Sequence, residues 1–375
     1  MKQYMLILIL LISLLNLNGC YSLQSNQQNL SFNSLNELPV TDSLHLKGLN
    51  MIDKLNGWVI SDKSVLKTED GGDTWLNVLP LKISEFPNGV KSVFLDQNVG
   101  WVLIDEYNSN GKPVVLYSTI DGGKQWKKSE LTIHGIISLA FASSKNGWLL
   151  SSPNGPAGPM DNVLVYHTTD GGDNWVNCNP SGLPSSAKID GIFFTNNDKG
   201  FITGMNYATG NSTYFFKSTT SGFLWENQKL NVPDNFKDYI KSTEPPLFWN
   251  EENGIIPVVF TRGDDNQISF SRTKDGGMTW TSGKVFSLGP MTGNNIVPYD
   301  FIDEKYGWLV YNGELYKSSD GSSSWEKVSK LSNIVEISFL TSKIGWAVAF
   351  DGKGEQLYRT DNGGASWVNL YPVIN

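Results

Sequence analysis

Short apolar runs alternate with polar turns along most of the chain, and they recur in groups. Each group opens with an apolar run, such as 90–95, 136–141 or 334–339, and a glycine followed by an aromatic or aliphatic residue comes next. A further run then leads into a Gly-rich turn that ends in tryptophan. Apolar runs of this length between turn signals indicate β-strands. The pattern predicts four short strands in each group, joined by hairpins.

Two motifs mark every group. The first is the glycine pair, and its seven copies are Gly57-Trp58, Gly100-Trp101, Gly147-Trp148, Gly200-Phe201, Gly254-Ile255, Gly307-Trp308 and Gly345-Trp346. The second is the turn motif, from Thr or Ser to Trp, at 68–75, 119–126, 168–175, 219–225, 273–280, 318–325 and 360–367. The turn motif recurs every 42 to 54 residues, and such a period indicates stacked or radially arranged supersecondary units.

A radial arrangement explains seven such units best. Seven four-stranded antiparallel sheets placed around an axis form a β-propeller, which leaves only short, protected strand edges. A linear stack of the same sheets would leave large faces uncovered. We therefore predict an all-β fold, a seven-bladed β-propeller with one turn motif per blade, over residues 44–375.

The tryptophans follow the two motifs closely. Of 13 tryptophans, seven lie in the turn motif and five in the glycine pair, which leaves Trp249. A buried indole removes on the order of 150–250 Å² from water, so residues locked to the repeat are suited to packing. We expect these rings to lie between neighbouring sheets rather than to stack against a ligand.

The chemistry of the turn motif is specific. An aspartate accepts backbone N–H bonds across a tight reversal, and glycines adopt the positive φ values that the turn requires. The motif residues are Asp70, Trp75, Asp121, Trp126, Asp170, Trp175, Trp225, Asp275, Trp280, Asp320, Trp325, Asn362 and Trp367. They resemble the Asp-box, or BNR repeat, whose turns join the third and fourth strands of a blade. The fourth copy (Ser221, Phe223) lacks the acid and the second glycine, the sixth has Ser322 and the seventh Asn362, so we expect looser turns there.

The alternation of glycine pair and Asp-box over residues 43–371 is similar to the photosystem II stability/assembly factor-like family. That resemblance implies a seven-bladed, non-catalytic binding scaffold, which also occurs in bacteria as secreted or lipid-anchored proteins. The chain contains three arginines, Arg262, Arg272 and Arg359, and so lacks the arginine-rich surface expected of photosynthetic members.

The N-terminus reads as a targeting segment. Lys2 precedes an apolar stretch, 6–15, that is too short to span a bilayer, and Leu17-Asn-Gly-Cys20 resembles a bacterial lipobox. We predict a lipoprotein signal peptide at 1–19, a lipidated Cys20 and a flexible tether at 20–43, which is rich in Ser, Gln and Asn. The protein would then be extracytoplasmic and anchored to the cell membrane. The alternative is an ordinary secretory signal with an unrelated cysteine.

Composition excludes several classes of function. The net charge is −8, and no basic patch exists that could neutralise a row of phosphates, so nucleic acid is not an expected partner. After signal removal and lipidation, Cys178 is the one remaining thiol, so no intramolecular disulfide forms and a catalytic role is disfavoured. His45, His134 and His167 show no metal-ligand spacing, and Asp264 and Asp265 offer too few ligands for calcium. We expect neither a metal nor a cofactor.

Asp-boxes also occur in enzymes. A sialidase needs three converging arginines, whereas Arg272 and Arg359 occupy equivalent repeat positions and cannot meet in one pocket. Xyloglucanase-type enzymes pair two propellers, and this chain has one. A glycoside hydrolase that uses two acids on one face stays open.

A binding function carried by the loops explains the sequence better than these enzyme functions do. The loops between second and third strands lie opposite the Asp-box turns, and they are long at 105–112, 151–162, 205–212 and 261–266. Candidate partner-binding residues are Tyr107, Met160, Tyr207, Arg262 and Asp265. Neutral drift in loop length is the alternative. We predict a monomeric scaffold that binds a protein partner and assists an envelope complex, with a carbohydrate-active protein as the second hypothesis.

Overall fold

The computed structural model describes residues 22–31, 46–61, 64–80, 90–105, 113–133, 135–152, 163–183, 188–205, 213–290, 297–370 and 373–374. Within these ranges the regular structure consists of β-strands and one 3-10 turn, Asp234–Phe236. The all-β prediction is confirmed.

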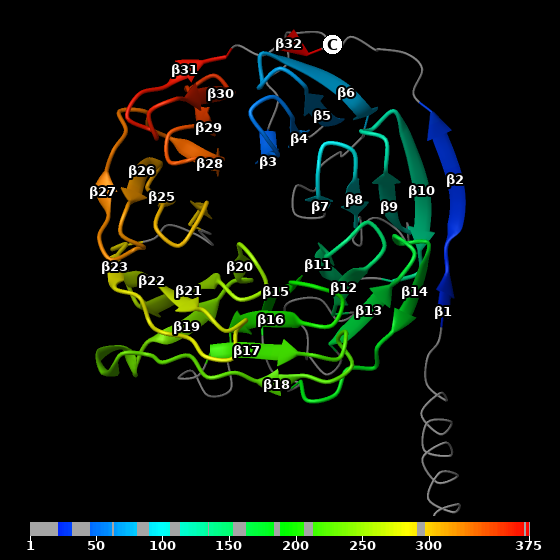
Figure 1. The fold of residues 1–375 in the computed structure, drawn as a ribbon, viewed down its shortest axis with the longest axis horizontal. Coiled ribbons are helices and arrows are strands. Elements are labelled where there is room, and N and C mark those ends of the chain that lie inside the picture. Colours follow the sequence, from blue (N-terminus) through cyan, green and yellow to red (C-terminus); the bar gives the residue numbers. More distant parts are fainter. Residues whose placement is uncertain are drawn as a thin grey trace, which may run out of the picture.

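In each repeat unit the strands lie one after another from the centre of a ring to its perimeter (Figure 1). Units 1 to 3 comprise β3–β6 (Leu46–Met51, Gly57–Ser61, Ser64–Thr68, Thr74–Pro80), β7–β10 (Val90–Phe94, Gly100–Ile104, Val114–Thr119, Gln125–Leu131) and β11–β14 (Ile136–Phe141, Gly147–Ser151, Leu164–Thr168, Asn174–Asn177). Units 4 and 5 comprise β15–β18 (Lys188–Phe194, Gly200–Met205, Thr213–Ser218, Glu226–Asn227) and β19–β23 (Ile240–Thr243, Leu247–Phe248, Gly254–Arg262, Asp265–Thr273, Val285–Ser287). Units 6 and 7 comprise β24–β27 (Tyr299–Phe301, Gly307–Tyr311, Glu314–Ser318, Glu326–Lys327) and β28–β31 (Ile334–Phe339, Gly345–Phe350, Glu355–Thr360, Val368–Asn369).

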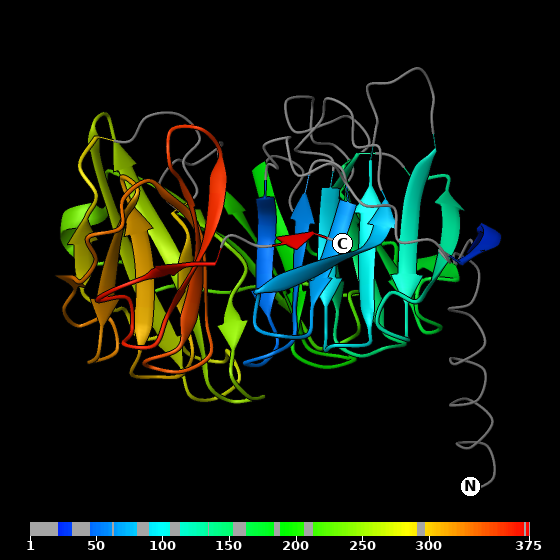
Figure 2. The same ribbon diagram turned by 90° about the horizontal axis from the view of Figure 1, so that it is seen from above.

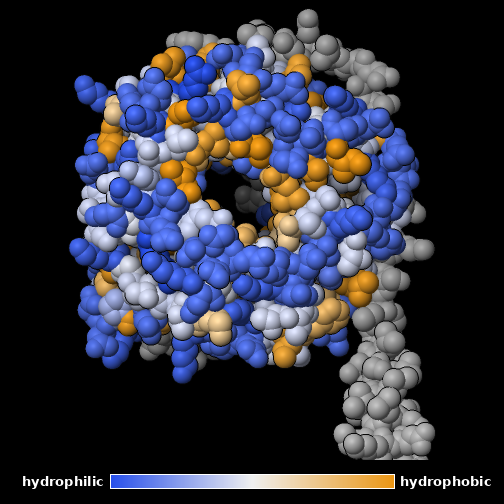
Figure 3. All heavy atoms as spheres, in the orientation of Figure 1, coloured by the Kyte–Doolittle hydropathy of each residue, from blue (hydrophilic) through white to orange (hydrophobic). Residues whose placement is uncertain are grey.

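The sheets stand side by side around an axis, and an opening remains at the centre (Figures 1 and 3). In the view from above, the strands run between two opposite faces of the ring (Figure 2). Neighbouring strands within each unit are antiparallel, as predicted. Units 4 and 5 join in one sheet because Met205 of β16 pairs with Ser242 of β19.

The second strand of every unit begins at a glycine because a bulky side chain lies opposite it. Phe141 pairs with Gly147 across the first two strands of unit 3, and a Cβ atom on Gly147 would lie 2.3 Å from the Phe141 ring. The same pairing recurs as Met51–Gly57, Phe94–Gly100, Phe194–Gly200, Phe248–Gly254, Phe301–Gly307 and Phe339–Gly345. Glycine is therefore required here for close approach rather than for an unusual φ.

The same phenylalanine contacts the preceding unit. The indole of Trp101 in unit 2 stacks on Phe141 in unit 3 with ring centroids 3.6 Å apart. Trp148 stacks on Phe194 at 3.6 Å, and Trp308 stacks on Phe339 at 3.8 Å. Offset stacking of this kind adds about 0.5–1.5 kcal/mol to the burial of the rings. Each glycine-pair tryptophan thus joins its own sheet to the next one.

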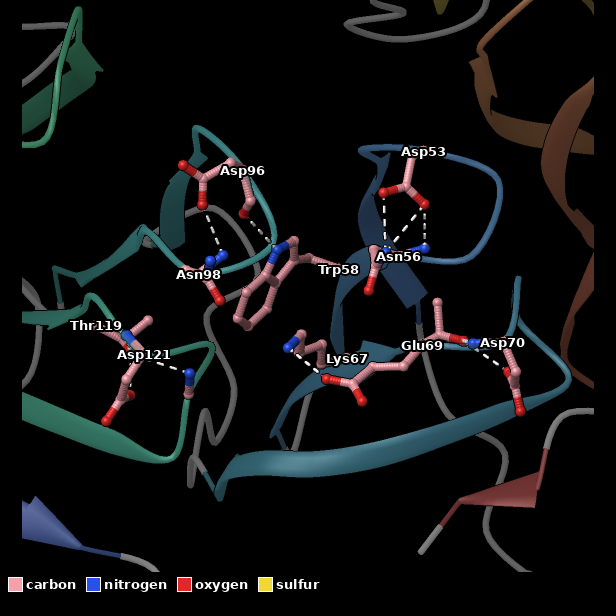
Figure 4. Close-up of polar contacts among 12 residues, drawn as sticks. Asp53, Asn56, Trp58, Lys67, Glu69, Asp70, Asp96, Asn98, Thr119 and Asp121 are labelled. Atoms are coloured by element: carbon pink, nitrogen blue, oxygen red, sulfur yellow. Dashed lines mark hydrogen bonds and ion pairs between the residues drawn. The ribbon is translucent and has the colours of Figure 1, made fainter.

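These indoles also donate hydrogen bonds across the same junctions. Trp101 Nε1 donates to the carbonyl of Gly171 at 2.8 Å, and Trp346 of unit 7 donates to the carbonyl of Gly71 in unit 1 at 2.8 Å. Trp58 donates to the carbonyl of Asp96 (Figure 4). The five glycine-pair tryptophans are at most 1% exposed, so the prediction that they pack between sheets is confirmed.

Both chain ends add strands to the perimeter. Ser22–Gln24 (β1) pairs with β14, Asn26–Ser31 (β2) pairs with β10, and Val373–Ile374 (β32) pairs in parallel with β6. For residues 22–31 the predicted flexible tether is therefore wrong. Backbone groups at the edge of a sheet can pair with any extended segment, and a polar side-chain pattern does not reveal this. Cys20 and residues 32–45 lie outside the described residues.

The loop predicted at 261–266 is also shorter than expected. Strand β21 continues to Arg262 and β22 begins at Asp265, so a two-residue turn joins two nine-residue strands. Gly263 adopts φ +61° in this turn, which suits a tight hairpin. The loops predicted at 105–112, 151–162 and 205–212 fall largely outside the described residues.

Replacing Trp148 tests the role of the indoles. We expect Trp148→Ala to lower the free energy of unfolding by about 3–5 kcal/mol, because it removes a fully buried ring between units 3 and 4. Trp148→Phe should cost far less, about 1–2 kcal/mol, because it keeps the stacking and loses mainly the hydrogen bond to Ser221. Unit 4 itself carries Phe201 at this position. Urea denaturation followed by circular dichroism measures both, and equal losses would contradict the stacking role.

Candidate functional site

The ring has two distinct faces. The first, called the Asp-box face, carries the Asp-box turns and the loops between first and second strands. In every unit a backbone N–H of the Asp-box turn donates to a carbonyl in that loop, as Gly71 does to Leu55 at 2.8 Å. The second, called the loop face, lies at the other ends of the strands. The position of the Asp-box between third and fourth strands is as predicted.

The Asp-box side chains are used inside their own turns. Thr68 Oγ1 donates to Asp70 Oδ1 at 2.9 Å and accepts from the N–H of Gly72 at 2.9 Å. Asp70 also accepts from the backbone and hydroxyl of Thr74, at 2.9 and 2.6 Å. The same bonds surround Asp320, where the hydroxyl of Ser324 lowers the pKa of the carboxyl to about 2. These acids are ionised and fully hydrogen-bonded, which suits structure rather than catalysis.

The fourth copy has a different register from the one predicted. Ser218, not Thr219, accepts the N–H of Gly222 at 3.1 Å, and Thr220 replaces the aspartate by accepting the N–H of Leu224 at 2.8 Å. Ser221 occupies the first glycine position at φ +54°, so the first glycine is missing rather than the second.

The predicted loosening of three turns is wrong. Ser322 adopts φ +60° in the sixth turn and keeps its N–H bond to Ser318 at 2.8 Å. Asn362 accepts the N–H of Ser366 at 2.9 Å in the seventh turn. Hydroxyl and amide oxygens accept these bonds as the carboxylate does, so the turn does not depend on charge.

A row of cations lies between the units on the Asp-box side. The residue before the Asp-box Thr or Ser pairs across the sheet with the second residue of the glycine pair, and five of seven are basic: Lys67, Lys217, Arg272, Lys317 and Arg359. Lys67 lies 5.5 Å from the centre of the Trp58 ring and 2.8 Å from Glu69 (Figure 4). Lys317 donates to the carbonyl of Ser342 in the next unit at 2.9 Å. Lys317 therefore connects units 6 and 7, whereas the two contacts of Lys67 lie within unit 1.

The three arginines occupy separate places. Arg272 donates to the carbonyl of Glu304 in unit 6, and a Nη1 atom of Arg359 lies beside Gly71 in unit 1. Arg262 lies on the loop face at the tip of the β21–β22 hairpin. Their separation confirms that they do not form the triad that a sialidase requires.

Two of the predicted partner-binding residues are described, and they contact each other. Arg262 Nη2 lies 3.8 Å from Asp265 Oδ2, and the guanidinium lies 4.3 Å from the centre of the Tyr239 ring. The phenol of Tyr239 donates to Asp265, and Gln267 Nε2 donates to the same carboxylate at 2.8 Å. The side chain of Arg262 is still 59% exposed, so it remains accessible to a partner. Tyr107, Met160 and Tyr207 lie outside the described residues.

Three acids were not predicted: Asp190 and Asp300 on the innermost strands β15 and β24, and Glu244 between β19 and β20. Burial raises the pKa of Glu244 to about 7, helped by the negative charge of Asp190 and opposed by Lys188. Burial also raises the pKa of Asp190, which accepts the Ser242 hydroxyl at 3.0 Å. Asp300, with a pKa raised by burial to about 6, accepts the N–H of Phe339 in unit 7 at 2.6 Å. A protonated carboxyl near neutral pH is able to act as a general acid.

The sequence carries a signal for these acids. Each lies in or beside an opening run that is otherwise apolar, and Glu244 is followed by Pro245 and Pro246, which separate β19 from β20. A charged residue in such a run indicates a position facing the axis of the ring. The run alone does not show how close acids from different units lie to one another.

Cys178 and His167 take part in packing within the sheets. The Sγ atom of Cys178 is buried and lies 3.8 Å from the carbonyl oxygen of Ser221. His167 stacks on Trp148 at 4.7 Å, and burial lowers the pKa of its imidazole. Among the described residues no group of His, Cys, Asp and Glu side chains is arranged to hold a metal ion. Nor do these residues include a helix of the length and hydrophobicity needed to cross a bilayer.

Glu244 should make stability depend on pH. Because its pKa is higher in the folded state than in the unfolded chain, its contribution is present below about pH 4.3 and is lost as the pH rises through about 7. We expect Glu244→Gln to raise the free energy of unfolding by about 1–3 kcal/mol at pH 8 and to change it little at pH 4. Urea denaturation at both pH values measures this. The exposed Glu252→Gln is the control, and a destabilised Glu244→Gln protein at pH 8 would contradict the burial argument.

Comparison with known proteins agrees with the repeat chemistry. The family described as "Photosynthesis system II assembly factor YCF48" matches residues 26–175, which contain the first two repeat units and the third as far as Trp175. Photosystem II stability/assembly factor HCF136 from Arabidopsis thaliana is 22% identical over 307 residues, covering 77% of this chain and 69% of that protein. The protein of the same description from Cyanidioschyzon merolae is 24% identical over 337 residues, covering 84% and 72%.

Solved structures agree on the fold. An ulvan lyase of polysaccharide lyase family PL25 superimposes with a TM-score of 0.50 at 10% identity, covering 92% of this chain and 97% of that one. An ancestral GH74 enzyme gives a TM-score of 0.50 at 14% identity, and this chain spans 47% of its length. Such low identities bear on architecture alone. Taken with the repeats, these similarities show that the chain is an Asp-box (BNR) repeat β-propeller resembling the photosystem II stability/assembly factors.

Proposed function

We propose that this protein is a closed seven-bladed β-propeller that binds a protein partner outside the cytoplasm and assists the assembly or stability of an envelope complex. The observation that carries the proposal is the use of the motif residues within the fold itself. The indoles and Asp-box acids are occupied in packing and turns, so the repeat forms a rigid scaffold and recognition falls to the loops. The two HCF136 relatives are described as stability/assembly factors, which supports a scaffold role.

Contacts between the first and last units support the closed ring. Besides the Trp346 bond to Gly71, Glu336 on β28 accepts the N–H groups of Gly48 and Leu49 on β3 at 3.0 and 3.1 Å. The junction also contains a buried apolar cluster from both units. We take each of the seven repeat units as one blade, with the propeller spanning residues 44–375 and acting as a monomer.

The loop face is the proposed binding surface. Arg262 extends from it on the β21–β22 hairpin. The Asp265 carboxylate of the same hairpin and the Tyr239 ring, which precedes β19, hold the guanidinium in place, so the cation is presented with little loss of side-chain entropy. Strands β8, β12 and β16 end at this face, and the sequence ranges that follow them contain Tyr107, Met160 and Tyr207. An exposed arginine with aromatic neighbours is typical of protein interfaces.

A carbohydrate-active function is the second candidate. It is favoured by Glu244, whose pKa of about 7 resembles that of a glycosidase general acid, and by two further acids, Asp190 and Asp300, on the inner strands β15 and β24. Against it, Asp190 and Asp300 already accept hydrogen bonds that satisfy neighbouring strands.

Removing the loop-face side chains should abolish partner capture. We expect Tyr107→Ala/Tyr207→Ala/Arg262→Ala to lose most of the proteins crosslinked by the wild type in living cells, as identified by mass spectrometry. The matched control is Ile120→Ala/Met278→Ala, which removes side chains that are 76% and 72% exposed on the Asp-box face.

An unchanged set of captured proteins in the loop-face variant would contradict the proposed surface. A different result would favour the carbohydrate function: the wild type and the loop-face variant capture polysaccharide, and the Glu244→Gln protein does not.

The proposed lipid on Cys20 would hold the ring close to the membrane. Strand β1 begins at Ser22, only two residues further on, so the anchor would lie next to the rim of unit 3. At about 3.5 Å per residue this leaves a reach of roughly 7 Å. We expect Cys20→Ala to move the protein from the membrane fraction to the soluble extracytoplasmic fraction, as measured by cell fractionation and immunoblotting. Retention in the membrane fraction would contradict lipid anchoring.

A further inference from the structure

The outer strands of the seven units differ in length. In units 4 to 7 the strands β18, β23, β27 and β31 contain two or three residues. In units 1 to 3 the strands β6, β10 and β14 contain seven, seven and four residues. A long outer strand exposes a row of unpaired N–H and C=O groups, which attracts further strands.

The three longer edges are also the three that carry an added strand. β32 pairs with β6, β2 with β10 and β1 with β14. Strands β1 and β2 belong to one stretch, called the N-terminal segment (Ser22–Ser31), which passes from unit 3 to unit 2 along the perimeter (Figure 1). A single extended segment thus covers two neighbouring blade edges.

The N-terminal segment is attached to unit 2 by a backbone ladder. It pairs with β10 over six residues, from Asn26 opposite Glu130 to Ser31 opposite Gln125. The side chains of residues 27–29 are exposed, and Leu30, opposite Trp126, is partly buried. Between the two strands, Ser25 Oγ donates to the carbonyl of Asp173 at 2.7 Å.

Opening of this segment leaves the ring in place. Of its described side chains, Leu30 and Ser25 are partly buried, and the buried clusters of units 2 and 3 are built from other residues. Edge elements with few buried contacts open at a fraction of the global unfolding free energy. The edge of β10 is then free to accept another strand, with hydrogen bonds that do not depend on sequence.

We infer that the outer edges of β10 and β14 form a strand-addition site, which the N-terminal segment occupies in the resting protein and an extended, uncharged segment of a partner protein occupies on binding. The partner would add a strand to the blade and use main-chain bonds for affinity. Recognition would come from one aliphatic side chain opposite Trp126 and a hydroxyl that reaches the carbonyl of Asp173. The inference rests on the proposed function, because it specifies how a protein partner is held.

The test uses the full chain with the N-terminal segment released. Gln27→Pro/Gln28→Pro places proline at consecutive positions, and since alternate residues of an antiparallel strand face the partner strand, at least one ladder hydrogen bond is lost. The matched control, Gln27→Thr/Gln28→Thr, keeps strand-compatible residues. The probe is a fluorescent peptide with the sequence of residues 22–31, and binding is measured by anisotropy.

We expect the proline variant to bind the peptide at least about tenfold more tightly than the control, because a competing segment lowers the apparent affinity by the fraction of open sites. Hydrogen exchange should show that the peptide protects backbone amides of β10, and a peptide carrying the Leu30→Asp change should bind more weakly. Both variants should retain the thermal unfolding midpoint of the propeller to within a few degrees.

Two results would overturn the inference. One is a folded proline variant that does not bind the peptide, and the other is a proline variant that dimerises through β10, which would make the segment a guard against self-association. The outcome is separable from the proposed function, because the peptide assay needs no cellular partner. If the protein does not bind the peptide but still captures its partner in cells, the strand-addition site is excluded and the loop face stays the proposed binding surface.

Discussion

The stacking of a tryptophan on the phenylalanine of the next unit is the contact that joins four of the seven neighbouring pairs of units, through Trp58, Trp101, Trp148 and Trp308. Four-stranded sheets of this size bury little apolar surface by themselves, so each must pack against its neighbours. The pair formed by Trp101 and Phe141 meets that need with stacked rings and an indole N–H bond to the Asp-box turn of the following unit. The glycine opposite Phe141 belongs to the same packing arrangement, because it has no side chain and leaves room for the ring.

The rest of the molecule follows from that junction. The Asp-box fixes the carbonyl that receives the indole, and a cation such as Lys317 reaches from one unit to a carbonyl of the next. These residues are occupied in packing. The regions left for binding or catalysis are the loop face, the three acids Asp190, Glu244 and Asp300, and the perimeter. The two proposals use the first and the last of these regions, with a rigid ring between them.

Much of the fold could be predicted from the sequence. The repeat of glycine pair and Asp-box gave the strand order, the turn positions and the burial of the indoles, because each motif has a strict geometric role. A further signal was present and was missed: a phenylalanine, or Met51 in unit 1, precedes each pair glycine by six residues. Backbone pairing of residues 22–31 could not be predicted, since edge hydrogen bonds leave no side-chain pattern. The pKa of Glu244 also depends on neighbours in other strands, which one sequence does not place.

The most direct test of the central claim is a double-mutant cycle on Trp101 and Phe141. If the rings join neighbouring sheets, the losses from Trp101→Leu and Phe141→Leu should not add, with a coupling energy of about 0.5–1.5 kcal/mol in urea denaturation. Losses that add fully would show that each ring stabilises only its own sheet, and would contradict the account.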